Sequence, residues 1–120
     1  MPAGKYNGEN AMIKNHKLTL IDKTQADGVE TLGNAGFEHL PNHQIQIEVS
    51  AKPSAGSLKI EFRTPGAVEY TEPDDSPVDM TTIDKAVCFR LNDVFADSFR
   101  ITPTSFDAAK TYSVIIVSNE

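Results

Sequence analysis

Two histidines, His39 and His43, stand four residues apart, the spacing that places two imidazoles on one face of a helix for zinc binding. Pro41 lies between them and removes a backbone donor, so a helix across this spacing is not expected. A zinc site would also need further ligands, and both His16 and the single cysteine, Cys88, are distant in sequence. The pattern therefore favours two surface loop histidines over a metal site.

The segment 72–79 reads EPDDSPVD and carries the carboxylates of Glu72, Asp74, Asp75 and Asp79. Carboxylate oxygens are the ligands that Ca²⁺ prefers, but the segment lacks the glycine and the alternate-position acidic spacing of a calcium loop. Its two prolines disfavour both a helix and a strand ladder. We expect an exposed, solvated loop that is able to face a basic partner surface.

The remaining reactive residue types indicate no enzyme. Cys88 is expected to be a small, buried or half-buried filler, with no base beside it to make it a nucleophile. No serine sits in a Gly-x-Ser-x-Gly elbow, and no phosphate-binding glycine loop is present. Exposed aromatics could bind a sugar, but the chain has no Trp and three Tyr, Tyr6, Tyr70 and Tyr112. We therefore expect a non-enzymatic protein with no catalytic residue, metal or cofactor.

Composition limits the partners. The 120 residues fit one domain, and a net charge of −6 repels nucleic acid and anionic membrane surfaces. One cysteine cannot form an intrachain disulfide, which suits assembly in a reducing cytosol. The N-terminal residues lack the apolar run of a signal peptide, and no stretch approaches the length of a membrane span.

Alternating apolar residues predict an all-β fold, because no window sustains the spacing of an amphipathic helix. The expected strands recur roughly every eight to twelve residues, which is typical of an antiparallel β-sandwich, immunoglobulin-like or jelly-roll-like. They lie at residues 17–22, 29–32, 44–51, 57–63, 67–71, 86–91, 98–103 and 111–117. The strands at 44–51 and 57–63 are expected to form a hairpin. The last strand is apolar on both sides, so we expect it inside a sheet, covered on both faces.

The first 16 residues are polar and rich in Asn and Gly, and they are predicted to be an extended N-terminal arm preceding a domain at 17–120. If this arm orders against a partner, its aromatic, apolar and basic side chains are the expected contacts. The candidate partner-binding residues are Tyr6, Met12, Ile13, Lys14 and Lys17.

Two stretches, PSAGSLKIEFRTPGAVEY at 53–70 and FADSFRITPTSFD at 95–107, followed by KTYSVIIV, resemble virion proteins of tailed bacteriophages. In such proteins a small β-sandwich attaches to the outside of the capsid or to the neck and tail. The resemblance implies a structural protein of the virion, assembled in the host cytoplasm and acting as a capsid decoration or cement protein.

The partner that the resemblance implies is the major capsid protein or another virion protein. A homo-oligomer is an option, a trimer among the forms to consider. The alternative functions are a neck, tail or fibre component and a carbohydrate-binding β-sandwich module.

Overall fold

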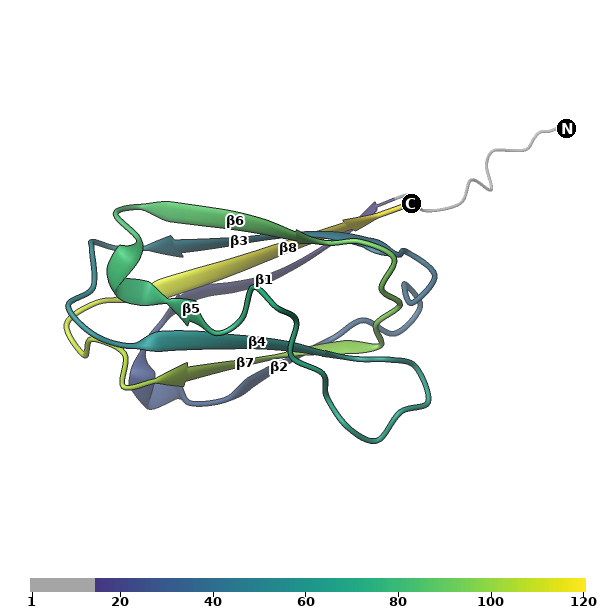
Figure 1. Ribbon diagram of the computed structural model, residues 1–120, viewed down its shortest axis with the longest axis horizontal. Coiled ribbons are helices and arrows are strands. Elements are labelled where there is room, and N and C mark those ends of the chain that lie inside the picture. Colours follow the sequence, from purple (N-terminus) through teal and green to yellow (C-terminus); the bar gives the residue numbers. More distant parts are fainter. Residues whose placement is uncertain (1–14) are drawn as a thin grey trace, which may run out of the picture.

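The computed structural model describes residues 15–120, which fold into two packed antiparallel sheets of four strands each (Figure 1). The elements are β1 (Asn15–Lys23), the 3₁₀ turn η1 (Gln25–Asp27), β2 (Glu30–Gly33), β3 (Asn42–Val49), β4 (Ser57–Arg63), β5 (Val78–Asp79), the 3₁₀ turn η2 (Met80–Thr82), β6 (Ala86–Leu91), β7 (Ser98–Thr104) and β8 (Tyr112–Asn119). The predicted all-β sandwich is therefore confirmed.

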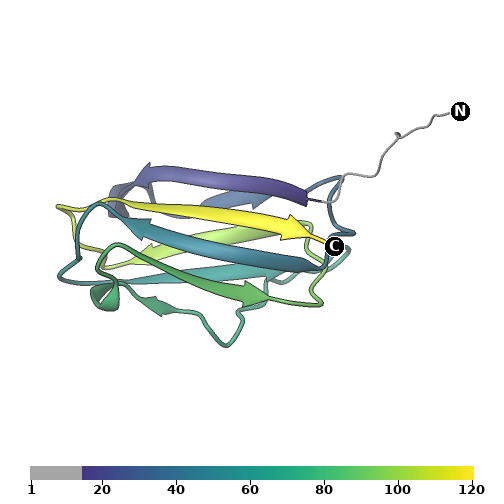
Figure 2. The same ribbon diagram turned by 90° about the horizontal axis from the view of Figure 1, so that it is seen from above.

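The pairing of the strands is nested. β1 pairs with β8, β2 with β7, β3 with β6 and β4 with β5, all antiparallel. Two further pairings, β3 with β8 and β4 with β7, complete sheets of order β1-β8-β3-β6 and β2-β7-β4-β5. The first order can be followed in Figure 2 across the sheet nearer the viewer, from the purple β1 to the green β6. This is the arrangement of a jelly roll, one of the two sandwich types that the sequence predicts.

The predicted hairpin between residues 44–51 and 57–63 is wrong. β3 and β4 lie in opposite sheets, because the segment between them crosses the end of the sandwich. Gly56 has a φ of 108° there, and a Cβ on it would lie 2.4 Å from the Cα of Phe106. The crossing is therefore packed directly against the segment between β7 and β8, at a position that only glycine fits.

The core lies between the sheets and follows the predicted alternation. Ile45 and Ile47 of β3 face Ile60 of β4 and Phe99 of β7, and all four are fully buried. Full burial of such a side chain contributes about 1.5 to 3 kcal/mol to folding. The regular spacing of these residues is the reason that the two layers stay in contact along their length.

The last strand, β8, lies between β1 and β3, as predicted. Its inward side chains, from Tyr112 to Ser118, are buried. On the other face, the described residues leave Ile115 and Val117 half-buried, so the expected full cover on both faces is wrong within residues 15–120.

Two further boundaries differ from the expected ones. β1 begins at Asn15, so Asn15 and His16, counted above with the arm, lie in a strand. Of the strand expected at 67–71, only Thr71 pairs, forming a single bridge with Phe62.

No helix within residues 15–120 is long and apolar enough to cross a membrane.

Candidate binding surfaces

Of the predicted partner-binding residues, Lys17 lies within the described part of the chain. It is exposed on β1, opposite Val117, on the outer face of the β1-β8-β3-β6 sheet. The other four candidates lie outside residues 15–120: Tyr6, Met12, Ile13 and Lys14. Beside Lys17, the imidazole of His16 stacks on Phe37 with ring centroids 3.6 Å apart, which ties the start of β1 to the loop before β3.

The expectation of two surface histidines is wrong for His43. Its side chain is 1% exposed and points inward from β3, whereas His39 is exposed in the preceding loop. The strand starts earlier than the sequence predicts, and this places His43 in the inward series that continues with Ile45. Within residues 15–120, no three His, Cys, Asp or Glu side chains gather in a group suited to hold a metal ion.

Both ring nitrogens of His43 are engaged. Nε2 lies 2.7 Å from the carbonyl oxygen of Val94 and Nδ1 lies 2.6 Å from Oγ of Ser118. Because a carbonyl only accepts, Nε2 carries the proton and the Ser118 hydroxyl donates to Nδ1. Burial disfavours the charged ring and lowers the pKa of His43, against a smaller opposing effect of the Val94 carbonyl. This histidine is a neutral, structural side chain.

Cys88 is exposed rather than buried, contrary to the sequence-based expectation. It lies on β6 opposite Gln46 of β3, and its neighbours Ala86 and Arg90 are also exposed. The alternation is as predicted, but the outer face of this strand has no cover among the described residues.

Tyr70 is held by a network on the outer face of the β2-β7-β4-β5 sheet. The guanidinium carbon of Arg100 lies 4.2 Å from its ring centroid, and that of Arg63 lies 5.5 Å away. Oγ of Ser98 lies 2.7 Å from the Tyr70 hydroxyl and donates its own hydrogen to Asp97, so the tyrosine is the donor. A sugar that stacked on Tyr70 would compete with these contacts.

Each arginine of this network is paired with an acid. Arg63 binds both carboxylate oxygens of Asp97, at 3.0 and 3.4 Å, and Arg100 Nε lies 3.0 Å from Oε1 of Glu61. Hydrogen bonding from Arg63 is the main cause that lowers the pKa of Asp97, and the carboxylate in turn raises the pKa of Arg63. These ion pairs join β4 to β7 and to the residue that precedes β7, and both guanidinium groups lie against the Tyr70 ring.

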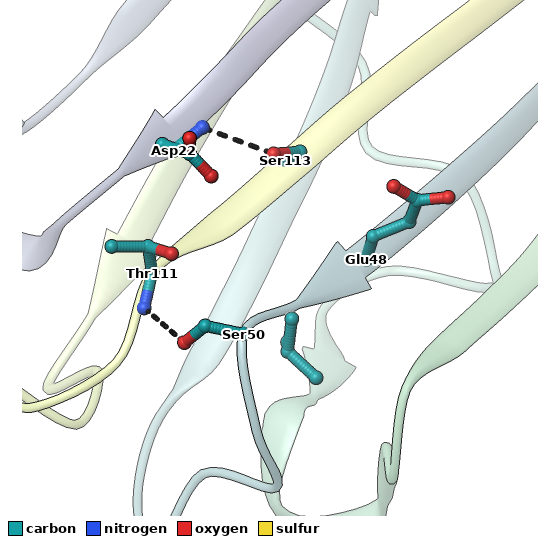
Figure 3. A pocket seen from close by; sticks show the side chains of 6 residues that line it. Asp22, Glu48, Ser50, Thr111 and Ser113 are labelled. Atoms are coloured by element: carbon teal, nitrogen blue, oxygen red, sulfur yellow. Dashed lines mark hydrogen bonds between the residues drawn. The ribbon is translucent and has the colours of Figure 1, made fainter.

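A polar hollow of about 110 Å³ opens at the end of β1, β3 and β8 (Figure 3). Its lining includes the carboxylates of Asp22 and Glu48 and the hydroxyls of Ser50, Thr111 and Ser113. Two of these hydroxyls accept backbone hydrogen bonds at 3.0 Å, Ser113 from Asp22 and Ser50 from Thr111. The hollow is smaller than the roughly 300 to 1,000 Å³ of typical ligand pockets.

A larger groove of about 430 Å³ lies between the end of β6 and the acidic segment that precedes β5. Its apolar lining includes Phe62, Leu91 and Val94. One wall carries the carboxylates predicted to be exposed, those of Glu72, Asp74 and Asp75. The sequence predicts the acidic wall but not the groove, because the groove depends on β4 and β6 lying in different sheets.

No protein-family model and no curated protein matches the chain. Among solved structures, it is similar to one described under Bacillus endospore appendages that form disulfide-linked pili, with 14% identity, a TM-score of 0.44 and coverage of 98% of this chain and 97% of that one. It is also similar to a structure described as CBM4, with 9% identity, a TM-score of 0.41 and coverage of 77% and 73%. Neither similarity bears on function.

Proposed function

We propose that the protein is a non-enzymatic structural protein of a phage particle, a capsid decoration or cement protein that binds and stabilises the assembled shell. The proposal rests on the sequence resemblance at 53–70 and 95–107. These two stretches contain β4 and β7, which pair along their whole length from Ser57 with Thr104 to Arg63 with Ser98. The resembling segments thus form one continuous part of the fold, and this observation carries the proposal.

The chemistry of the described side chains supports a binding role. Two groups that could react make structural contacts instead: His43 with Val94 and Ser118, and Asp97 with Arg63. What the fold presents to a partner is its strand edges and the acidic-walled groove. A module that binds only the assembled shell stabilises it by mass action, and many copies multiply modest individual contacts.

The test is the number of copies of this chain relative to the major shell protein in purified particles. A decoration protein is expected at on the order of hundreds of copies per particle, and a neck, tail or fibre component at about a dozen or fewer. Particles stripped of the protein should also release their contents at a lower temperature than complete ones. Absence of the chain from purified particles would overturn the proposal.

A further inference from the structure

The outer edge of β6 is unprotected. Within residues 15–120, β6 is the last strand of its sheet and β3 is its sole ladder partner. The equivalent edge of β4 is covered: β5 pairs with its start, Ser76 Oγ accepts from the amide of Ile60 at 2.9 Å, and Thr71 bridges to Phe62. β6 reads AVCFRL, with no proline and one charge, so it lacks the features that usually keep strand edges apart.

The hydrogen-bond pattern shows which backbone groups this edge offers. The amide of Val49 donates to the carbonyl of Lys85 at 2.9 Å, and this pair continues the β3–β6 register. Because hydrogen-bonded and non-hydrogen-bonded pairs alternate in an antiparallel ladder, Val87, Phe89 and Leu91 bond to β3. The N–H and C=O groups of the intervening residues point to the open edge. These residues are Ala86, Cys88 and Arg90.

We propose that β6 pairs with β6 of a second copy of this chain, antiparallel, about a two-fold axis that passes beside Cys88. The two β1-β8-β3-β6 sheets then form one continuous sheet of eight strands, four from each copy. The pairing uses the free donors and acceptors of Ala86, Cys88 and Arg90 and leaves the β3 ladder intact.

The apolar side chains of β6 complement themselves under this symmetry. Val87, which is 38% exposed, comes to lie opposite Phe89 of the partner subunit, which is half-buried in the monomer. This is a non-hydrogen-bonded pair, the type in which facing side chains approach most closely. The dimer therefore buries two such pairs, one on each side of the axis.

The charges also complement each other. Lys85, which is exposed, comes to lie opposite Leu91 of the partner subunit, at the groove whose wall carries Asp74 and Asp75. On the outer face, Ala86 lies between Glu48 of β3 and Arg90 of the partner subunit. Because the Ala86 side chain is small, this arginine and Glu48 face each other across it. Each of these contacts occurs twice because the interface is isologous.

Two other two-fold registers fit less well. An axis at Arg90 places two guanidinium groups directly opposite each other, and like charges in that position are destabilising. An axis at Ala86, the first residue of β6, leaves most of the strand unpaired. The register centred on Cys88 pairs residues 86–90 of the two copies and combines matched apolar pairs with matched charged pairs.

The test is the mass of the full chain by sedimentation equilibrium across a concentration series. We expect a reversible shift from 13.1 kDa towards twice that mass as concentration rises, weakened by salt because ion pairs contribute. Cys88→Pro should abolish the dimer, since it removes an N–H that points to the open edge and not to β3. Cys88→Ser is the matched control and should dimerise like the natural chain.

A charge exchange tests the register without changing the backbone. Lys85→Glu should raise the dissociation constant of the dimer at least tenfold, because the new carboxylate faces Asp74 and Asp75 of the other copy. Adding Asp74→Lys and Asp75→Lys to Lys85→Glu should restore dimerisation, since the charges on both sides of each contact are then reversed. This series remains informative if Cys88→Pro fails to fold, which circular dichroism would reveal.

Thiol crosslinking locates the axis. A short bismaleimide should join two copies through Cys88 efficiently. A control chain with Cys88→Ser and Thr19→Cys, which carries its single thiol on the exposed side of β1, should crosslink poorly. A monomer at high concentration, a trimer, or a charge series without effect would overturn the proposal. The experiment uses isolated protein, so its outcome is independent of the copy number on particles.

Discussion

The Nε2 atom of His43 lies 2.7 Å from the carbonyl oxygen of Val94, so a buried imidazole joins β3 to the segment that leads from β6 to β7. Phe99 packs against the same ring edge to face, with centroids 5.2 Å apart. The contacts require the neutral ring, because protonation would put a charge in a site that burial disfavours.

Stability should therefore fall in mildly acidic solution. The pKa of His43 is lowered in the folded state, so below about pH 6.5 the unfolded chain binds a proton that the folded chain does not. The free energy of unfolding, measured in urea, should decrease from pH 7.5 to pH 5. His43→Gln should be less stable at pH 7.5 by about 1 to 3 kcal/mol and should lose most of this slope. His39→Gln, at an exposed site, should keep the slope; equal slopes in all three proteins would contradict the assignment.

The crossing between β3 and β4 should tolerate no side chain at Gly56. An added Cβ would lie 2.4 Å from the Phe106 Cα, and the φ of 108° is strained for any other residue. Gly56→Ala is expected to lower the free energy of unfolding by about 3 kcal/mol or more. Gly66→Ala is the matched control, because its φ is 86° but no atom lies within 4 Å; it should cost about 1 kcal/mol. Chemical denaturation of both variants measures the difference.

Tyr70 should contribute to stability through its ring and its hydroxyl separately. Tyr70→Phe removes the 2.7 Å hydrogen bond to Ser98 and should cost about 1 kcal/mol. Tyr70→Ala also removes the contacts with Arg63 and Arg100 and should cost about 2 kcal/mol. Thermal unfolding monitored by circular dichroism gives both values. If Tyr70→Phe and Tyr70→Ala are both as stable as the natural chain, the contacts of the ring contribute nothing to stability. The ring would then be available to stack on a sugar, which binding to a glycan array would test.

Asn34 should be required as an amide donor. It is 1% exposed, and its Nδ2 donates to the Ala96 carbonyl at 2.8 Å, which links the end of β2 to the start of β7. Asn34→Ala is expected to lower the free energy of unfolding by about 2 kcal/mol, because a buried carbonyl loses its donor. Asn34→Asp should cost more, since it places a carboxylate beside that carbonyl. Urea denaturation at pH 7 compares them, and a stable Asn34→Asp would refute the assignment.

The period-two pattern predicted the strands well because it reports which side of a strand is buried. The apolar residues that alternate along the expected strands, among them Ile45, Ile47, Ile60 and Phe99, are buried in the structure. The same pattern does not say in which sheet the next strand lies, because two strands face a common core whether they pair or stack. The hairpin between β3 and β4 was predicted for that reason and is wrong.

Sites on the surface were harder to predict. Cys88 alternates with Val87 along the strand at 86–91 and so lies on its opposite side. Whether that side is covered depends on β6 being an edge strand, which is a property of the whole topology. The burial of His43 was missed because Pro41 suggested a loop, whereas β3 already begins at Asn42. The groove beside Leu91 joins residues from three segments, Phe62, 71–75 and 90–94, and has no local signature.

The first and last strands begin and end at the same pole of the molecule, where Asn15 lies opposite Asn119. Tension applied through these two points would load the β1–β8 ladder one rung at a time, as a zip fastener opens, and not all rungs together. The domain should therefore unfold at a lower force when it is pulled from these two ends than when it is held along the sides of its strands, where many hydrogen bonds share the load.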